Sequence, residues 1–174
     1  VPAIRHRAVP GLRRESSTKI RTMPRRRNRL PPDSYTVPGT VWHITVSTYL
    51  KSPHLADPET AHLVAESLRF QSQRTESNLI IYCVMPDHLH AVIEVDELTL
   101  EELVRRFKSW TTNRWMKAHR DSRLWQPSFY DHGVRVIESM SDLIAYVVNN
   151  PVKAGLVESW ETYEWIGGSI FEDP

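Results

Sequence analysis

The chain has 174 residues, enough for one domain with a buried core, and 40% of them are hydrophobic and 25% charged. This composition is typical of a globular protein of the cytoplasm, and no apolar run approaches the roughly 20 residues of a membrane-spanning helix. The single cysteine, Cys83, excludes an internal disulfide and any zinc site built from several cysteines.

The net charge of +1 hides a strong asymmetry along the chain. Residues 1–30 hold ten Lys and Arg residues against one acid, which leaves twelve basic and twenty acidic residues in the rest. Pro and Arg dominate residues 1–38, which predicts a flexible basic arm before a folded domain over residues 39–174. Such arms bind nucleic acid by releasing counterions, here through Arg25, Arg26 and Arg27. The alternative is a solubilising tail or a vector remnant.

The first half of the domain predicts a strand, a helix and a second strand. Residues 40–48, "TVWHITVST", alternate between apolar and polar, as a half-buried strand does. Asp57 followed by Pro58 is a helix start, and the helical pattern continues to about residue 74. The apolar run over residues 78–85 is typical of a second strand.

A hairpin and a long helix are predicted next. The Pro-Asp pair after residue 85 reads as a tight turn, so residues 88–95, "HLHAVIEV", return as an antiparallel strand. Thr99 and Glu102 have the spacing of a capping box, and the apolar residues after them recur at helical spacing.

The end of the chain completes the predicted fold. Residues 130–137 read as a fourth strand, and a last helix over residues 139–150 must stop before Pro151. The order β-α-β-β-α-β predicts an α+β, ferredoxin-like sandwich with an additional C-terminal helix. In this fold two helices cover one face of the sheet, and we expect the other face to be open.

Two histidines stand one residue apart on the hairpin strand. Residues i and i+2 of a strand point to the same face, so His88 and His90 are predicted side by side on the open face. Two interpretations remain: strand-surface imidazoles bonded to polar neighbours, or two ligands of one metal ion.

The last helix carries a second pair of polar groups. Tyr146 and Asn150 are four residues apart and share one helix face. The amide oxygen of Asn150 is a possible third ligand of a divalent ion, and the phenol of Tyr146 is a nucleophile for a cation-polarised phosphate. The alternative is a core tyrosine and an asparagine at a helix end.

Three motifs in this order, "MPDHLHAV", "LWQPSFYDHGVR" and "AYVVNNPVKAGLV", resemble the REP-associated tyrosine transposases, relatives of the single-strand transposases of the HUH superfamily. The resemblance covers roughly residues 38–166. It implies a bacterial, nucleoid-associated enzyme that cleaves and rejoins single-stranded or hairpin DNA through a 5′-phosphotyrosine, with Mg²⁺ or Mn²⁺ and without ATP. Tyr146 matches the nucleophile, His88 and His90 the histidine pair, and Asn150 the third ligand.

Other residues are candidates for supporting roles. Asp87 is adjacent to the histidine pair and is a possible acceptor that orients one imidazole. His132 and Arg135, on the fourth predicted strand, are candidates for supporting the site or contacting phosphate. Arg106 and Lys108, on the second helix, are candidates for holding the DNA backbone.

Two features depart from the family pattern: the Arg-rich arm, and "EWIGGSI" where many relatives have Trp-Ser-Ser. The sequence also leaves open a non-catalytic or domesticated nucleic-acid-binding protein on the same fold. A monomer and a homodimer with exchanged tyrosine helices are both compatible with it.

Overall fold

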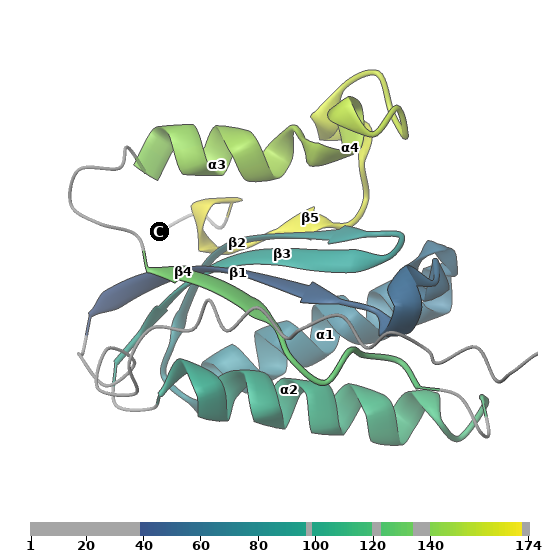
Figure 1. The fold of residues 1–174 in the computed structure, drawn as a ribbon. Helices are drawn as coiled ribbons and strands as arrows, with labels where there is room; N and C mark the ends of the chain where they lie inside the picture. The colour runs from purple at the N-terminus through teal and green to yellow at the C-terminus, as the bar shows by residue number, and fades with distance from the viewer. Residues whose placement is uncertain (1–38, 97–98, 120–122, 134–139, 172–174) are drawn as a thin grey trace, which may run out of the picture.

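The computed structural model describes residues 39–96, 99–119, 123–133 and 140–171 (Figure 1). The predicted arm, with Arg25, Arg26 and Arg27, lies outside these residues, and so does Arg135.

The strands are β1 (Thr40–Ser47), β2 (Asn78–Met85), β3 (His88–Val95), β4 (Tyr130–Gly133) and β5 (Ile166–Gly167). The α-helices are α1 (Pro58–Arg74), α2 (Leu100–Trp115), α3 (Met140–Val148) and α4 (Asn150–Lys153). Short 3₁₀ turns are η2 (Tyr49–Lys51), η3 (His54–Ala56), η4 (Trp160–Thr162) and η5 (Ser169–Phe171).

The sheet is antiparallel in the order β4-β1-β3-β2-β5, and its first four strands with α1 and α2 form the predicted ferredoxin-like sandwich. The described part of β4 ends at Gly133, four residues before the end of the predicted strand. No helix of the described residues combines the length and apolar character needed to cross a bilayer.

The helix starts follow from local sequence. Asp57 caps α1 as predicted, and the hydroxyl of Thr99 accepts the backbone N–H of Glu102 at 3.2 Å at the start of α2. In a complete capping box the side chain of Glu102 would bond back to the N–H of Thr99. Among the described residues that carboxylate has other partners. Both carboxylate oxygens of Glu102 instead accept hydrogen bonds from Arg105 and Arg106.

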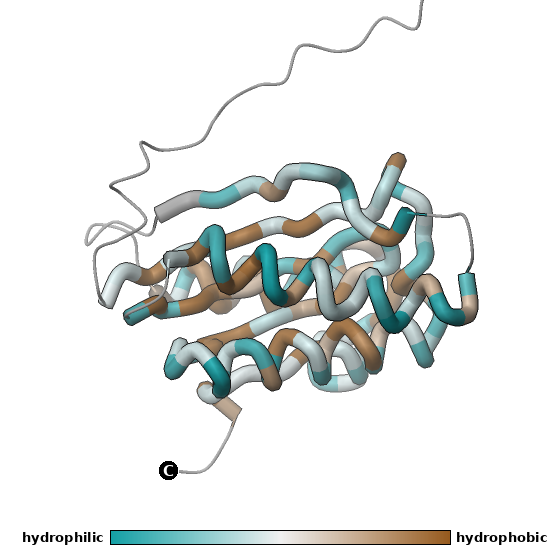
Figure 2. Tube along the Cα trace, turned by 90° about the horizontal axis from the view of Figure 1, so that it is seen from below, coloured by the Kyte–Doolittle hydropathy of each residue, from teal (hydrophilic) through white to brown (hydrophobic). Residues whose placement is uncertain are grey.

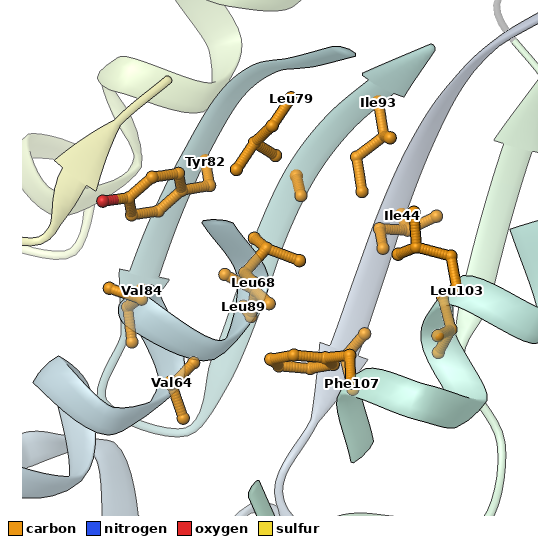
Figure 3. Packing of buried hydrophobic residues seen from close by; sticks show 14 of the residues in the cluster. Ile44, Val64, Leu68, Leu79, Tyr82, Val84, Leu89, Ile93, Leu103 and Phe107 are labelled. Carbon is orange, nitrogen blue, oxygen red and sulfur yellow. The ribbon is translucent and has the colours of Figure 1, made fainter. Parts of the chain in front are cut away.

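The main core lies between the sheet and the pair α1 and α2 (Figure 3). Ile44, Leu89 and Ile93 from the strands meet Leu103 and Phe107 from α2, and all five are fully buried. Each such side chain contributes roughly 1.5–3 kcal/mol through burial. Along both helices hydrophobic and hydrophilic residues alternate (Figure 2), as expected for helices with one face on a sheet.

The opposite face of the sheet is not open, which corrects the sequence prediction. Helix α3 lies across it (Figure 1), and a second apolar cluster is buried between them. Val147 and Val148 of α3 pack there with Val92 of β3, and Leu143 and Ile144 pack at its border. The added helix carries an apolar stripe, and burying that stripe requires the sheet face that a minimal ferredoxin-like fold leaves exposed.

The C-terminal tail adds a fifth strand that the sequence did not predict. β5 pairs with β2, and the backbone approaches so closely that only glycine fits. A Cβ on Gly167 would lie 2.5 Å from the hydroxyl of Tyr82, and one on Gly168 would lie 2.4 Å from the Ile80 carbonyl oxygen. Gly168 also has a φ of +139°. The two glycines of "EWIGGSI" therefore have a packing reason.

Candidate active site

The hairpin strand places His90 under α3, with His88 beside it. His90 lies on β3 in the middle of the sheet, opposite Thr45 of β1 and Cys83 of β2, and is only 5% exposed. His88, the first residue of the strand, is half-buried. The two imidazoles share one face as predicted, but that face is covered rather than exposed.

The two histidines direct the same ring nitrogen toward a common point. Their Nε2 atoms lie 3.0 Å apart, and the rings are nearly perpendicular. Two unprotonated ring nitrogens cannot hydrogen-bond to each other, so this approach requires a proton on one of them or a cation between them.

The other ring nitrogen of each histidine, Nδ1, also has a partner within the protein and is called its outer nitrogen below. Nδ1 of His88 lies 2.5 Å from the carboxylate of Asp87, which also pairs with Lys51 at 3.4 Å. Nδ1 of His90 lies 3.1 Å from the hydroxyl of Thr45 and 3.2 Å from Nε2 of His43. The carboxylate of Asp87 can only accept, so it holds the proton of His88 on Nδ1 and leaves Nε2 of that ring as the ligand atom, which is how metal-binding histidines are held in proteins.

His43 is a site residue that the sequence did not reveal. It is buried on β1, and its ring stacks on that of His90 with 5.3 Å between centroids. The alternation of β1 put it on the polar face of that strand, but only the pairing of β1 with β3 brings it next to the histidine pair. Burial, with His88 and His43 adding to it, lowers the pKa of His90 to about 3. His90 is therefore neutral near pH 7, as a metal ligand must be.

Tyr146 lies over these rings. From α3 it makes edge-to-face contacts with both His43 and His90, each with 5.7 Å between centroids. Its side chain is nevertheless 42% exposed, and the ammonium group of Lys153 lies 5.1 Å from its ring centroid. The phenol thus sits between a buried histidine cluster and solvent, within reach of a substrate.

Asn150 is held beside Tyr146 by the end of α3. That helix ends at Val148, two residues before the predicted end, and Asn150 opens α4, which contains Pro151 in its first turn. Its side-chain amide nitrogen donates to the carbonyl oxygen of Tyr146 at 2.8 Å. The bond satisfies a carbonyl at the helix end and uses only the nitrogen, so the amide oxygen is the group left for a ligand.

The two predicted residues of α2 are not gathered with these. Lys108 donates to the carbonyl oxygen of Gln126 at 2.5 Å, and Arg106 pairs with Glu102 at 2.7 Å. Both lie on α2, which covers the face of the sheet opposite to α3. The backbone of His132 pairs with that of His43 in the ladder between β1 and β4.

The fold and site together define a ferredoxin-like protein whose central strand carries a histidine pair beneath a tyrosine-bearing helix. A family model described as "Transposase IS200 like" matches residues 36–150, more than half of the chain. The chain belongs to the IS200-like transposase family.

Its relatives bear out the resemblance seen in the sequence. The chain is 24% identical over 146 residues to the REP-associated tyrosine transposase of Escherichia coli, covering 80% of this chain and 81% of the relative. It is 26% identical over 93 residues to a provisionally named REP-associated tyrosine transposase of Haemophilus influenzae, covering 45% of this chain and 52% of that protein. The chain thus spans about half the length of the Haemophilus relatives it matches.

A solved structure shares the fold. The structure of a REP-associated tyrosine transposase bound to a REP hairpin superimposes with a TM-score of 0.63 at 21% identity. The match covers 76% of this chain and 78% of the other.

Proposed function

We propose that this protein cleaves and rejoins single-stranded DNA next to a hairpin, with Tyr146 as the nucleophile. The observation that carries the proposal is the contact of Tyr146 with the ring of His90, while the phenol stays accessible to solvent. The proposed nucleophile thus lies over a pair of imidazoles, next to open solvent from which a DNA strand can approach, and Asn150 stands one helical turn away from it.

The donor set fits a divalent cation. The described residues contain no group of three His, Cys, Asp or Glu side chains arranged for a metal. The proposed set instead combines His88 and His90, whose free nitrogens converge, with the amide oxygen of Asn150. Imidazole ligands suit Mn²⁺ better than Mg²⁺, which prefers oxygen. When bound, such an ion would offset the negative charge of the scissile phosphate.

The protein's own residues account for the rest of the reaction. The oxygen of Tyr146 bonds to phosphorus, and the bond from phosphorus to the 3′ oxygen breaks. The phenol loses one proton and the leaving 3′ oxygen gains one, so the protons balance. Lys153, above the ring, favours the negative charge that develops on the phenol. The product is a 5′-phosphotyrosine, and attack by a 3′-OH reverses the step, so ATP is not needed.

Tyr146 contacts the histidines of its own sheet. This favours an active monomer over a dimer with exchanged helices. The covered sheet face argues against the alternative of a binding module that holds bases on an open sheet, as RNA-recognition domains do. The REP hairpin in the related structure suggests hairpin DNA as the substrate.

The test is a trapping experiment. A labelled oligonucleotide with a hairpin and single-stranded flanks is incubated with the protein and Mn²⁺, and a covalent adduct is sought on a denaturing gel. We expect an adduct with the wild type and none with Tyr146→Phe. The matched control is Tyr130→Phe, since Tyr130 is also an exposed tyrosine but lies on β4. Equal cleavage by wild type and Tyr146→Phe excludes Tyr146 as the nucleophile, and binding without any adduct supports the non-catalytic alternative.

A further inference from the structure

A second concave site lies at the edge of the sheet, where the C-terminal tail packs beside β2 and α1. The cleft has a volume of about 300 Å³. Its walls include Arg69 of α1 and, from the tail, Trp160, Glu161, Tyr163, Gly167 and Phe171. The proposed reaction uses none of these residues.

Aromatic faces form one side of this cleft. The rings of Trp160 and Phe171 lie 6.0 Å apart at an interplanar angle of 32°. Trp160 is partly buried against the second apolar cluster, whereas Phe171 is 48% exposed. One ring is therefore anchored and the other accessible, an arrangement suited to a flat ligand that stacks on aromatic rings.

Polar groups on the other walls give the cleft hydrogen-bonding capacity. The guanidinium of Arg69 lies 5.5 Å from the centroid of the Tyr82 ring, at the edge of the sheet. Glu161 offers a carboxylate on the tail side, where Ser159 donates to it. A donor and an acceptor next to aromatic faces match the edge of a nucleobase, which presents both kinds of group.

The cleft is preformed by the way the tail is fixed to β2. Tyr163 donates its hydroxyl to the carbonyl oxygen of Val84 at 2.8 Å, and the N–H of Val84 donates to the Trp165 carbonyl oxygen at 2.9 Å. Gly167 and Gly168 contribute only backbone to the lining. A ligand therefore meets an ordered wall, and little ordering of the tail is needed on binding.

The cleft also lies close to the candidate active site. Ile166 of β5 pairs with Cys83 of β2, and Cys83 pairs with His90 of β3. Neighbouring strands are about 4.8 Å apart, so two strand spacings, or about 10 Å, separate Ile166 from His90. A DNA strand with its phosphate beside Tyr146 needs only a short run of nucleotides to reach the cleft.

We infer that this cleft holds an unpaired base of the DNA strand, a few nucleotides from the scissile phosphate, stacked against Trp160 and Phe171. The inference rests on the proposed function, because the ligand is a part of the proposed substrate. Bound there, the base would set which phosphate of the single-stranded flank lies beside Tyr146.

Photo-crosslinking tests this directly. A series of hairpin oligonucleotides carries 5-iodouracil at one unpaired position each, and each is irradiated with the full-length Tyr146→Phe protein, which is not expected to cleave. We expect one position to give a crosslink in a peptide that contains Trp160 or Phe171. An abasic residue at the same position should weaken binding at least about tenfold.

Two variants and one control sharpen the test. Trp160→Ala and the milder Phe171→Ala should lose the crosslink, with retained folding checked by thermal unfolding. Trp110→Ala is the matched control, because Trp110 is likewise partly buried and packs against a phenylalanine ring, that of Phe70, but lies on α2. Crosslinks elsewhere with none in the tail, or unchanged crosslinking and affinity in both tail variants, would overturn the inference.

Failure of this inference and failure of the proposed function are distinguishable. If the wild type forms the covalent adduct but no tail peptide is crosslinked, only the base-binding cleft is rejected. If the tail is crosslinked but no adduct forms, the cleft stands as a DNA-binding site and the assignment of catalysis to Tyr146 is rejected.

Discussion

The Nε2 atoms of His88 and His90 lie 3.0 Å apart, while their outer nitrogens are bonded to Asp87 and to the pair Thr45 and His43. A hydrogen-bonded pair of imidazoles needs a proton between these nitrogens, and a metal site needs a cation there. Metal binding therefore discriminates between the two interpretations that the sequence left open.

Mn²⁺ should stabilise the folded protein. A ligand that binds only the folded state adds about 2.7 kcal/mol at a concentration of one hundred times its Kd. For a domain of this size this amounts to a rise in Tm of several degrees, reversed by EDTA. The measurement is thermal unfolding with and without Mn²⁺.

His90→Ala should abolish this rise in Tm, and His54→Ala should keep it. His54 is a suitable control because it lies in η3 with its ring tilted against that of Trp115, and it has no part in the proposed site. An equal rise in wild type and His90→Ala would assign the bound ion to another place on the protein.

The partners of the outer nitrogen of His90 should tune metal affinity without contacting the metal. Thr45→Val preserves the shape of the side chain but removes the hydroxyl 3.1 Å from Nδ1. Loss of an outer partner typically weakens metal binding 10–100-fold, and the hydroxyl of Thr45 shares this role with His43. We therefore expect a loss of about tenfold for Thr45→Val and a larger loss for the double change with His43→Phe.

Isothermal titration with Mn²⁺ measures this effect, and it separates positioning from general destabilisation. Thr48→Val is the matched control, because Thr48 is a buried threonine of the same region that bonds to backbone carbonyls instead. If both threonine variants bind Mn²⁺ equally well, the hydroxyl of Thr45 does not orient His90.

Local sequence signals predicted the helix starts, strand β1 and the hairpin of this fold. The N-caps of α1 and α2 depend on residues three apart, and the alternation of β1 depends on its own side chains, so both are readable from the sequence. The predicted strand pair β2 and β3 likewise followed from a two-residue turn.

Contacts between distant segments were not predictable in the same way. The role of His43 depends on β1 pairing with β3, and the burial of His90 depends on α3 lying across the sheet. β5 has only two residues, and its pairing with β2 requires the close approach at Gly167. Neither periodicity nor propensity carries such information, because each depends on the tertiary arrangement.

The cap of α1 should make stability depend on pH in acid. The carboxylate of Asp57 accepts the hydroxyl of Thr60 at 2.6 Å and its N–H at 2.9 Å, and these bonds hold the pKa of Asp57 below its usual value. A lowered pKa in the folded state means that the stabilisation is present at pH 7 and is lost as the pH falls below about 4.

Asp57→Ala should therefore cost about 1 kcal/mol of unfolding free energy at pH 7, and the difference from wild type should shrink at pH 3. Asp57→Asn keeps an uncharged cap and should show little of this pH dependence. Urea unfolding of the three proteins at both pH values is the measurement. A difference that stays constant between pH 7 and pH 3 would show that the charge of Asp57 does not contribute.

Leu50 holds a strained conformation next to the candidate site. It and Lys51 both have positive φ, 55° and 58°, and Leu50 is 75% exposed. The turn is fixed on both sides, because Thr48 bonds to the backbone of Asp87 and Tyr49 to that of Leu124. The left-handed conformation costs a residue with a Cβ roughly 1–2 kcal/mol, and the exposed side chain recovers little of this through burial.

Leu50→Gly should therefore stabilise the protein, by about 0.5–1 kcal/mol after the entropic cost of glycine is subtracted. The matched control is Leu156→Gly, because Leu156 is another exposed leucine, at 43%, and is not among the described residues with positive φ. That change should leave stability equal or lower, since it brings no relief of strain and adds freedom to the unfolded chain. Both are measured by urea unfolding at pH 7. If Leu50→Gly and Leu156→Gly unfold at the same urea concentration, the left-handed turn beside Asp87 stores no strain. The conformation of Leu50 is then set by favourable contacts instead.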